Sequence, residues 1–385
     1  MEQLMERSGR VRVLAAAQEA GAANALVPVI TTLRRSLSAE VVVAACAQAA
    51  EVFAGAGLSP RQADAIEPLM REASPNVLLL GTSWGWTLDK RLLSLGNECL
   101  LPSVSVVDHW THYRERFLDP RSNRLVLPTR IAVPDQVALA QAARAGLPED
   151  LMIATGHPHL ETMINALEAP GCQARARELR RAWCESLGRS PDGSRVVLFV
   201  SEPFSQFHGP GSPSPYDFTE QDALEGVVEA IETLEQQTRG RLALVVKRHP
   251  REQSQPLQFG SRAKRRNLCV VSGQEPSSVC VMAADLVVGM LSMVLLEAVL
   301  AGRPASSFRP TRTAAEAFIG SELGLVESAF SVEALRRWLS EACSAGSSAR
   351  DRMRQAAAGV LAHQGAAARI ADLVMELAVE ARMAS

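Results

Sequence analysis

Short runs of apolar residues alternate with longer amphipathic segments along most of the chain. Apolar runs bounded by polar and turn-forming residues predict buried strands, and the amphipathic segments between them predict helices. Strands that alternate with helices are typical of a parallel sheet covered by helices on both faces. The strands are predicted at 11–17, 40–47, 63–67, 76–81, 103–107, 130–133 and 151–154 in a first half, and at 196–200, 241–246, 268–271, 286–288 and 305–308 in a second half.

The helices predicted between these strands fill the remaining length of both halves. The first follows the segment 18–24 and ends near Ser36, with Pro28 near its start. The others are predicted at 51–57, 89–95, 136–145, 222–238, 332–342 and 350–381. The pattern therefore predicts an α/β protein built from two Rossmann-like halves.

The chain has 385 residues, which is long for one hydrophobic core and suits two domains. Polar helical sequence followed by the turn-rich Ser-Pro-Asp-Gly at 190–193 separates the two sets of strands. We expect an N-terminal domain at 1–160 and a C-terminal domain at 161–360. A last helix at 361–385 is expected, for which packing against the N-terminal domain is one option.

Composition narrows the class of protein further. Hydrophobic residues make up 47% and charged residues 21%, which is typical of a globular chain. The net charge of −2 gives no electrostatic reason to bind nucleic acid or membrane. The seven cysteines are scattered without a Cys-x-x-Cys pair, so we expect no zinc site and a reducing, cytoplasmic location. The first residues lack an apolar signal core, and no apolar run approaches the roughly 20 residues of a membrane span.

A buried strand–turn–helix unit is predicted at 285–304. Its strand is the apolar run 286–288, after which Gly289 lets the backbone turn. Ser292 is a good N-cap for a helix at 293–301, because its hydroxyl can accept a backbone N–H. The N–H groups and positive dipole at the start of a helix suit a phosphate.

Glu297 is the residue of this unit that is hardest to bury. Between residues 290 and 301 the polar side chains are those of Ser292 and Glu297. Gly302 and Pro304 are expected to end the helix. A carboxylate on an apolar helix is costly unless it is paired or faces a ligand, such as the hydroxyls of a ribose. The same pattern also fits a core unit in which the serine only caps and the glutamate pairs with an arginine.

Polar clusters follow the predicted strands in both halves. Ligands of doubly wound sheets lie outside the carboxyl ends of the strands, so these clusters predict a cleft between the domains that is lined from both sides. The full dinucleotide-binding, P-loop and nucleophile-elbow motifs are missing, which disfavours nicotinamide or flavin enzymes, P-loop kinases and α/β-hydrolases. The clusters are at 21–24, 82–86, 108–116, 155–159, 201–206, 247–252 and 289–292.

Asp108 and His109 end a predicted buried strand, where either side chain could serve as a general base. For Asp108, an N-cap or an ion pair with Arg114 or Arg116 is the competing interpretation. Four aromatic residues gather at strand ends of the same half, where they could pack against a sugar or plug the core. These are Trp84, Trp86, Trp110 and Tyr113. His157 is expected to be structural.

Four segments together resemble GT-B glycosyltransferases. Lys-Arg-His-Pro-Arg-Glu at 247–252, Gly-Met-Leu-Ser-Met-Val-Leu-Leu-Glu at 289–297 and Ala-Gly-Arg-Pro at 301–304 look like the donor-binding half of that group, and Thr-Gly-His-Pro at 155–158 is similar to its domain junction. The group includes lipid-A-disaccharide synthase, CDP-glycerol transferases, capsule sialyltransferases and UDP-GlcNAc 2-epimerase-like proteins. The epimerases usually carry Gly-Thr-Arg-Pro-Glu where this chain has Gln-Glu-Ala-Gly-Ala at 18–22, which speaks against epimerisation.

The resemblance implies a transferase that moves a sugar from a nucleotide-sugar donor to a sugar, lipid-linked or small-molecule acceptor. An epimerase or hydrolase of the same fold, or a non-catalytic sugar-nucleotide-binding protein, is the alternative. No metal and no cofactor are expected. The implied donor site is Ser201, Glu202, Lys247, His249, Pro250, Gly289, Ser292, Met293 and Glu297, with phosphate at His249 and Ser292 and ribose at Glu297. The implied acceptor site is Gly21, Asn24, Trp84 and Arg114, with the base at Asp108 or His109.

Overall fold

The computed structural model divides the chain into two compact units, each described here by itself. Unit 1 comprises Met1–Thr162 and His363–Ser385, and unit 2 comprises Met163–Ala362. The structure describes residues 9–63, 65–206, 217–238, 242–249, 252, 269–271, 275–311, 318–344, 355–357 and 364–384.

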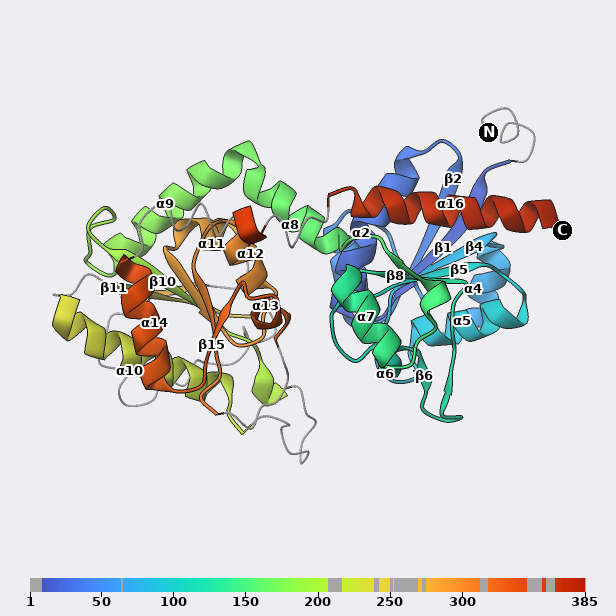
Figure 1. Ribbon diagram of the computed structural model, residues 1–385. Helices are drawn as coiled ribbons and strands as arrows, with labels where there is room; N and C mark the ends of the chain where they lie inside the picture. The colour runs from blue at the N-terminus through green and yellow to red at the C-terminus, as the bar shows by residue number, and fades with distance from the viewer. Residues whose placement is uncertain are drawn as a thin grey trace. The chain divides into compact units, whose positions relative to one another are not determined.

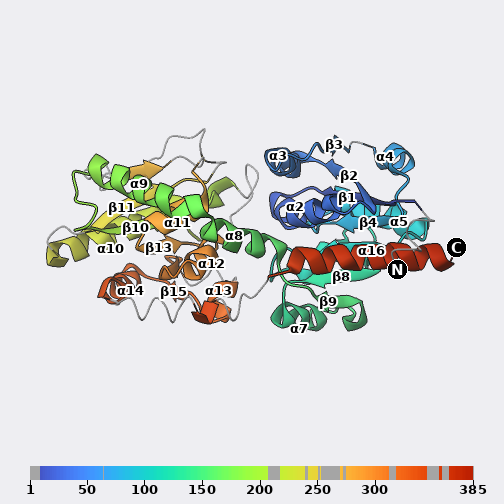
Figure 2. The ribbon, with the colours of Figure 1, turned by 90° about the horizontal axis from the view of Figure 1, so that it is seen from above.

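Unit 1 is built on a sheet of seven parallel strands among its described residues, in the order β3-β2-β1-β4-β5-β8-β9. Figure 2 shows these strands side by side from β3 to β9. Their bounds are β1 (Val11–Ala17), β2 (Ala39–Ala45), β3 (Arg61–Gln62), β4 (Val77–Leu80), β5 (Ser103–Val106), β8 (Arg130–Val133) and β9 (Met152–Ala154). A small antiparallel hairpin joins β6 (Leu118–Asp119) to β7 (Arg124–Leu125).

Helices cover both faces of this sheet because successive side chains of a strand point to opposite sides. Val13 and Ala15 of β1 pack against α2 (Ala20–Arg35), α3 (Ala47–Gly55) and the C-terminal helix α16 (Ala366–Ala384), which lies beside α2. Leu14 and Ala16 pack against α4 (Ile66–Ala73) and α5 (Leu88–Glu98) on the other side. The remaining helices are α6 (Tyr113–Phe117), α7 (Gln136–Arg144), η1 (Glu149–Leu151) and α8 (Pro158–Glu168).

Unit 2 repeats this plan with six parallel strands among its described residues, in the order β12-β11-β10-β13-β14-β15 (Figure 1). The bounds are β10 (Arg195–Val200), β11 (Leu242–Lys247), β12 (Cys269–Val271), β13 (Leu286–Gly289), β14 (Ala305–Phe308) and β15 (Glu327–Ala329). One face packs against α10 (Glu220–Thr238) and α14 (Val332–Ser344). The other helices are α9 (Pro170–Ser186), η2 (Phe204–Gln206), α11 (Ser277–Ala283), α12 (Val294–Leu300) and α13 (Ile319–Glu322).

Both sheets reverse their strand order at one place, which is the place where such sheets bind ligands. In unit 1 the chain leaves β1 toward β2 on one side and continues from β4 on the other. In unit 2 the same reversal lies between β10 and β13. The loops after these four strands are therefore the candidate sites.

Three sequence predictions of local structure are wrong. The first helix starts at Ala20, so Gly21 and Asn24 lie on α2 and Pro28 lies in its interior. The segment 20–26 is rich in alanine, the best helix former, and this propensity outweighs the turn signal of Gly21. Instead of a strand at 63–67, α4 begins at Ile66, whose spacing to Leu69, Met70 and Ala73 places four buried side chains on one helix face.

The last predicted helix, 350–381, is not continuous in the described residues. Gly365 has φ +75°, a left-handed conformation that ends or begins a helix, and α16 starts directly after it. The carboxylate of Glu161 on α8 accepts from the amides of Gly365 and Ala367, which caps the start of α16.

Candidate functional site

Glu202 joins the loops that follow β10 and β13. Its Oε2 atom accepts hydrogen bonds from the amides of Leu291 at 2.8 Å and Met290 at 3.3 Å. Burial raises the pKa of this carboxyl to about 7, against the effect of the amide hydrogen bonds, and the negative charge of Glu252 raises it further. Two amides in the turn just before the predicted phosphate site therefore already bind a carboxyl group.

The helix after this turn is shorter than predicted, and it starts one residue later than predicted. It is α12, with Met293 at its N-cap position and Val294 as its first residue. The Ser292 hydroxyl accepts from the Val294 amide at 3.2 Å, but Ser292 precedes the N-cap position, so the prediction that it is the N-cap is wrong by one residue. Gly302 has φ +70°, so the prediction of a left-handed residue after the helix is confirmed.

Gly289 has a different role from the predicted one. It is the last residue of β13 and pairs with Ser307 of β14, and it is not among the described glycines with positive φ. A Cβ atom at this position would lie 3.3 Å from Cδ2 of Leu295. Glycine leaves room for Leu295 of α12 to pack closely against the end of the strand, and the expectation of a special turn conformation is wrong.

Glu297 is buried with one carboxylate oxygen unsatisfied. Its side chain is 1% exposed, and Oε2 has no hydrogen-bond partner among the described residues. Burial raises the pKa of Glu297 to about 7, against a side-chain hydrogen bond with Ser277 and the positive charge of Lys247. The cation that acts on Glu297 is thus a lysine, whereas the core alternative from the sequence required an arginine.

Lys247 and Ser277 complete a polar group around Glu297, which we call the Glu297 cluster. Lys247 is the last residue of β11, is 8% exposed, and donates to the carbonyl of Glu275 at 2.7 Å. Ser277 begins α11, and Arg175 on α9 pairs with Glu275 at 3.1 Å. The end of β11, the start of α11 and the first turn of α12 thus place these groups at the carboxyl edge of the sheet.

Glu252 organises the segment after β11 and was not singled out from the sequence. Its carboxylate accepts from the Ser201 hydroxyl at 2.7 Å and from the His249 amide at 2.7 Å. Arg248 donates to the carbonyl of Glu252. Burial raises the pKa of Glu252. Its role could have been predicted from the sequence, because a carboxylate three positions after His249 can accept from the His249 amide and cap a turn.

Pro250, the remaining predicted donor residue, lies outside the described residues. Ser201 and His249 are brought together through Glu252, and Glu202 meets the turn before α12. Within unit 2 the fold thus gathers the predicted donor residues into two groups, one around Glu202 and Glu252 and one around Glu297.

In unit 1, Asp108 forms a buried ion pair with Arg116. Oδ1 of Asp108 lies 2.6 Å from Nη1 of Arg116, and the two side chains are 12% and 7% exposed. Arg116 also donates to the carbonyl and hydroxyl of Thr82 and to the carbonyl of Thr111. Of the interpretations left open by the sequence, the ion pair with Arg116 is the one observed. Arg114 is exposed on α6 and lies near Gly146.

Gly21 lacks a side chain at the point where the Asp108 carboxylate packs against α2. A Cβ atom on Gly21 would lie 2.3 Å from Oδ2 of Asp108, so the carboxylate rests against the first turn of α2. Glu19, missed by the sequence analysis, precedes this turn, and part of its side chain faces solvent. Partial burial and the charge of Asp108 raise the pKa of Glu19, against a hydrogen bond from the Trp84 amide. Asn24 is half-buried one turn further along α2.

Two histidines hold the loop after β5. Nδ1 of His109 lies 2.9 Å from the Thr111 hydroxyl. His157 is buried, and its Nε2 atom donates to the carbonyl of Asp108 at 2.9 Å, which ties the loop after β9 to the loop after β5. This position agrees with the structural role predicted for His157.

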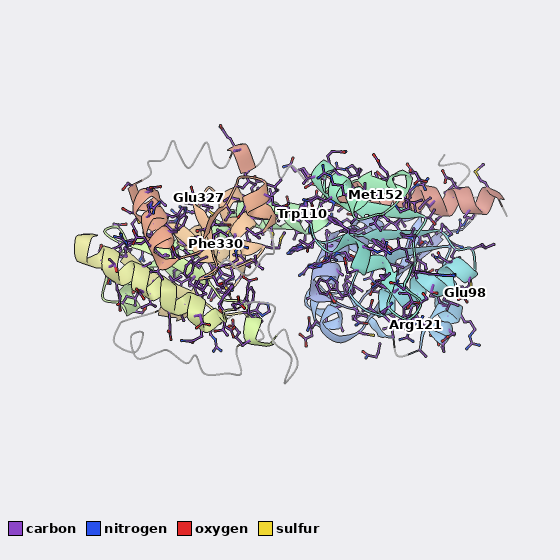
Figure 3. The ribbon with its side chains drawn as sticks, turned by 60° about the horizontal axis from the view of Figure 1, so that its bottom comes forward. Glu98, Trp110, Arg121, Met152, Glu327 and Phe330 are labelled. Atoms are coloured by element: carbon purple, nitrogen blue, oxygen red, sulfur yellow. The ribbon has the colours of Figure 1, made fainter. Side chains whose placement is uncertain are left out.

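The aromatic residues divide into buried and exposed ones. Trp110 is buried, stacks on His157 with 5.3 Å between ring centroids, and donates to Asp135 at 2.7 Å. Figure 3 shows Trp110 at the opposite end of unit 1 from Glu98, the last residue of α5. Trp84 is 49% exposed and meets the His112 ring edge-on at 4.2 Å. Trp110 therefore packs in the core, whereas the ring of Trp84 is partly exposed to solvent.

A second group of buried polar residues, absent from the sequence predictions, begins α5. The side chains of Ser83, Thr87 and Asp89 are at most 5% exposed, and each has an oxygen without a partner among the described residues. Burial raises the pKa of Asp89. The adjacent Lys90 is also buried, and it donates to the carbonyls of Glu115 and Leu118 around α6.

Several solved structures are similar in fold to this protein over nearly the whole length of the chain. UDP-GlcNAc 2-epimerase from Neisseria meningitidis bound to UDP-GlcNAc matches with a TM-score of 0.65 and 14% identity, over 94% of this chain and 99% of that one. The glycotransferase of kitacinnamycin matches with a TM-score of 0.60 and 18% identity, over 96% and 99%. Anabaena HepE in complex with UDP and glucose matches with a TM-score of 0.63 and 12% identity, over 96% and 100%. The chain has the GT-B fold.

The GT-B resemblance drawn from the sequence motifs is therefore confirmed at the level of fold. No protein-family model matches the chain, and no curated protein matches it. Across the described ranges, no helix is long and apolar enough to cross a membrane. The same part of the chain contains no group of three or more His, Cys, Asp or Glu side chains that could hold a metal ion.

Proposed function

We propose that this GT-B protein is a glycosyltransferase that uses a nucleotide-sugar donor. The observation that carries the proposal is the Glu297 cluster: a buried carboxylate with an unsatisfied oxygen, at the carboxyl edge of the sheet of unit 2. A buried polar atom without a partner is costly, and a ligand hydroxyl can supply the missing hydrogen bond. Structural neighbours that contain UDP, UDP-GlcNAc or UDP with glucose support this ligand class.

The donor is assigned to unit 2. Glu297 accepts from a ribose hydroxyl through Oε2, which requires a small shift of the side chains that cover it, since Glu297 is 1% exposed. The phosphates lie at the turn of Met290 and Leu291, near Ser292, with His249 as a further donor. Backbone amides and cationic side chains neutralise the leaving group in this scheme, so it uses no metal and no cofactor.

The acceptor is assigned to unit 1, with Trp84 as the surface on which a sugar ring packs. Asp108 and His109 remain the proposed sources of the general base. Asp108 is held by Arg116, and His109 by the Thr111 hydroxyl. Fixed side chains of this kind favour a defined geometry for proton transfer. The acceptor itself belongs to cell-surface polysaccharide, glycolipid or natural-product biosynthesis in this proposal.

Epimerisation is the second candidate function. The similarity in fold to UDP-GlcNAc 2-epimerases, with TM-scores as high as 0.65, favours it. Against it stands the segment Gln18–Ala22, which lacks the Gly-Thr-Arg-Pro-Glu of those enzymes. A fold of this kind hosts both reactions, so fold alone cannot choose between them.

A two-stage experiment tests the proposal. A thermal-shift screen against UDP-, CMP-, CDP-, GDP- and dTDP-sugars identifies the donor, because a ligand that binds the folded state raises its melting temperature. The donor is then incubated with the protein with and without candidate acceptors, and the sugar is analysed by NMR. Transfer needs the acceptor, whereas epimerisation proceeds without it. Binding without turnover in either mixture indicates a non-catalytic binding protein, and no stabilisation by any nucleotide-sugar contradicts the proposal.

A further inference from the structure

The turn between β13 and α12 already contains an anion that belongs to the protein. Oε2 of Glu202 lies 2.8 Å from the Leu291 nitrogen and 3.3 Å from the Met290 nitrogen. These two amides are 89 and 88 residues from Glu202 in sequence, so the contact depends on the pairing of β10 with β13. The contact shows that the turn binds an anionic oxygen, and that its amides are not free.

Among the described residues, the charged group with the largest effect on Glu202 is itself negative. This group is Glu252, in the segment after β11. Two cations of that segment lie among the described residues: Lys247 donates to the Glu275 carbonyl and Arg248 to the Glu252 carbonyl. The ionised form of Glu202 is stabilised by the amide hydrogen bonds and opposed by burial.

We propose that Glu202 is an intramolecular competitor of the donor phosphate, so that the donor binds tightly only when this carboxyl is neutral or has left the turn. The inference rests on the proposed function and adds to it a pH-dependent control of donor binding. Two anionic groups cannot share the same pair of amide donors without strong repulsion. Glu202 is then a positioning residue. It keeps the turn ordered before the donor binds, and the donor phosphate displaces it.

The direction of the pH dependence follows from the titration of Glu202. The pKa of this group is raised by burial to about 7. Below that value the carboxyl is neutral and leaves the turn at little cost, whereas above it each donor that binds must displace or protonate a carboxylate. Donor affinity should therefore fall by about tenfold for each pH unit above about 7.

The test is calorimetry with UDP-GlcNAc between about pH 6 and about pH 8.5, on the wild type and on Glu202→Gln. The diphosphate of this probe carries a constant charge in that range, so the ligand itself adds no titration. Wild-type affinity should fall steeply with pH, and affinity of the variant should fall less, because only His249, whose residue type titrates in this range, remains as a titrating phosphate contact. At about pH 8 the variant should bind about tenfold more tightly than the wild type. Glu202→Ala should show the same reduced pH dependence.

Glu220→Gln is the matched control. Glu220 is another carboxylate near the loop after β10, where it accepts from the amide and hydroxyl of Ser205. In the part of the chain that the structure describes, the Met290 and Leu291 amides donate to Glu202 and not to Glu220. This variant removes the same charge from the same region. It should keep the wild-type pH profile, and melting temperatures of all variants check that they fold.

Two results overturn the inference while the proposed function survives. One is tight binding of UDP-GlcNAc by the wild type with a pH profile that Glu202→Gln does not change. The other is weaker binding by Glu202→Gln at every pH, which would make Glu202 a direct ligand contact. If UDP-GlcNAc does not bind, the same series is run with the nucleotide-sugar found by the thermal-shift screen. A wild type that binds no nucleotide-sugar overturns the proposed function, and this inference with it.

Discussion

Asp108 and Arg116 form an ion pair that the fold buries at the carboxyl edge of unit 1, with 2.6 Å between Oδ1 and Nη1. The guanidinium also binds the Thr82 carbonyl and hydroxyl and the Thr111 carbonyl, so it connects the loops after β4 and β5. The pair thereby gives Asp108 a structural role in addition to its proposed role as a base.

Asp108→Asn should reduce both stability and turnover. Removal of one partner of a buried ion pair leaves the Arg116 charge uncompensated, at a cost of about 3–5 kcal/mol. Loss of a general base should reduce turnover by roughly 10²–10⁴-fold, with donor affinity little changed. Denaturant titration and turnover measurements check the two effects. Glu72→Gln is the control, because Glu72 pairs with Arg61 on the surface, where both side chains are exposed, and such pairs contribute at most about 1 kcal/mol. Unchanged turnover in folded Asp108→Asn would assign the base to His109 or elsewhere.

Gly21→Ala should be destabilising, although alanine is the better helix former. Its Cβ would lie 2.3 Å from Oδ2 of Asp108, which forces the carboxylate away from Arg116. We expect a loss of about 1–3 kcal/mol. Gly55→Ala on α3 is the matched control, because a Cβ there meets nothing within 4 Å and should stabilise the helix by about 0.5–1 kcal/mol. Equal melting temperatures of the two variants would contradict the close packing of Gly21.

Glu297→Gln should fold and bind the nucleotide-sugar more weakly. The amide keeps the shape of the side chain but replaces a charged acceptor by a neutral one, which costs about 1.5–3 kcal/mol in affinity. Burial disfavours the charged form of Glu297, so the variant should be at least as stable as the wild type above about pH 7. Calorimetry and melting curves on the same variant check this. A large loss of stability with intact affinity would make Glu297 a core partner of Lys247 and remove the ribose assignment.

His249→Ala should weaken nucleotide binding and leave the fold intact. The hydrogen bond that His249 makes with Glu252 uses its backbone amide, which alanine retains. Loss of one charge-assisted bond to phosphate costs about 1.5–3 kcal/mol. The melting temperature should therefore stay near that of the wild type while calorimetry shows reduced affinity. Unchanged affinity in the folded variant would exclude His249 from the donor site.

The stability of the ligand-free protein should fall as pH rises from about 4.5 to about 7. Burial raises the pKa of Glu202 and of Glu297 to about 7, well above that of a glutamate in the unfolded chain. The folded state therefore holds protons that the unfolded state releases, and each group contributes a loss on the order of 3 kcal/mol across this range. Urea titrations at about pH 5 and pH 8 should show a smaller loss for Glu297→Gln than for the wild type. An equal loss would show that Glu297 titrates normally.

Local features of the molecule could be predicted from the sequence because they depend on neighbours in the chain. The run 11–17 gave β1 and the run 130–133 gave β8, since burial on both faces of a parallel sheet requires continuous apolar residues. Gly302 marked the end of α12 through its left-handed backbone, and Ser292 lies one residue before the N-cap at its start. The alternation of such elements was enough to predict two parallel sheets and, with the motifs, the GT-B fold.

The partners of the site residues were decided only by the tertiary structure. The sequence left Arg114 and Arg116 as equal partners for Asp108, and the position of α6 selected Arg116. Glu202 meets amides almost 90 residues away because the strand order places β13 beside β10. Apolar periodicity reports whether a residue is buried, but it contains no information about which loops meet at the edge of a sheet. That depends on strand order and register, and these bring together residues whose separation in sequence is unrelated to their distance in space.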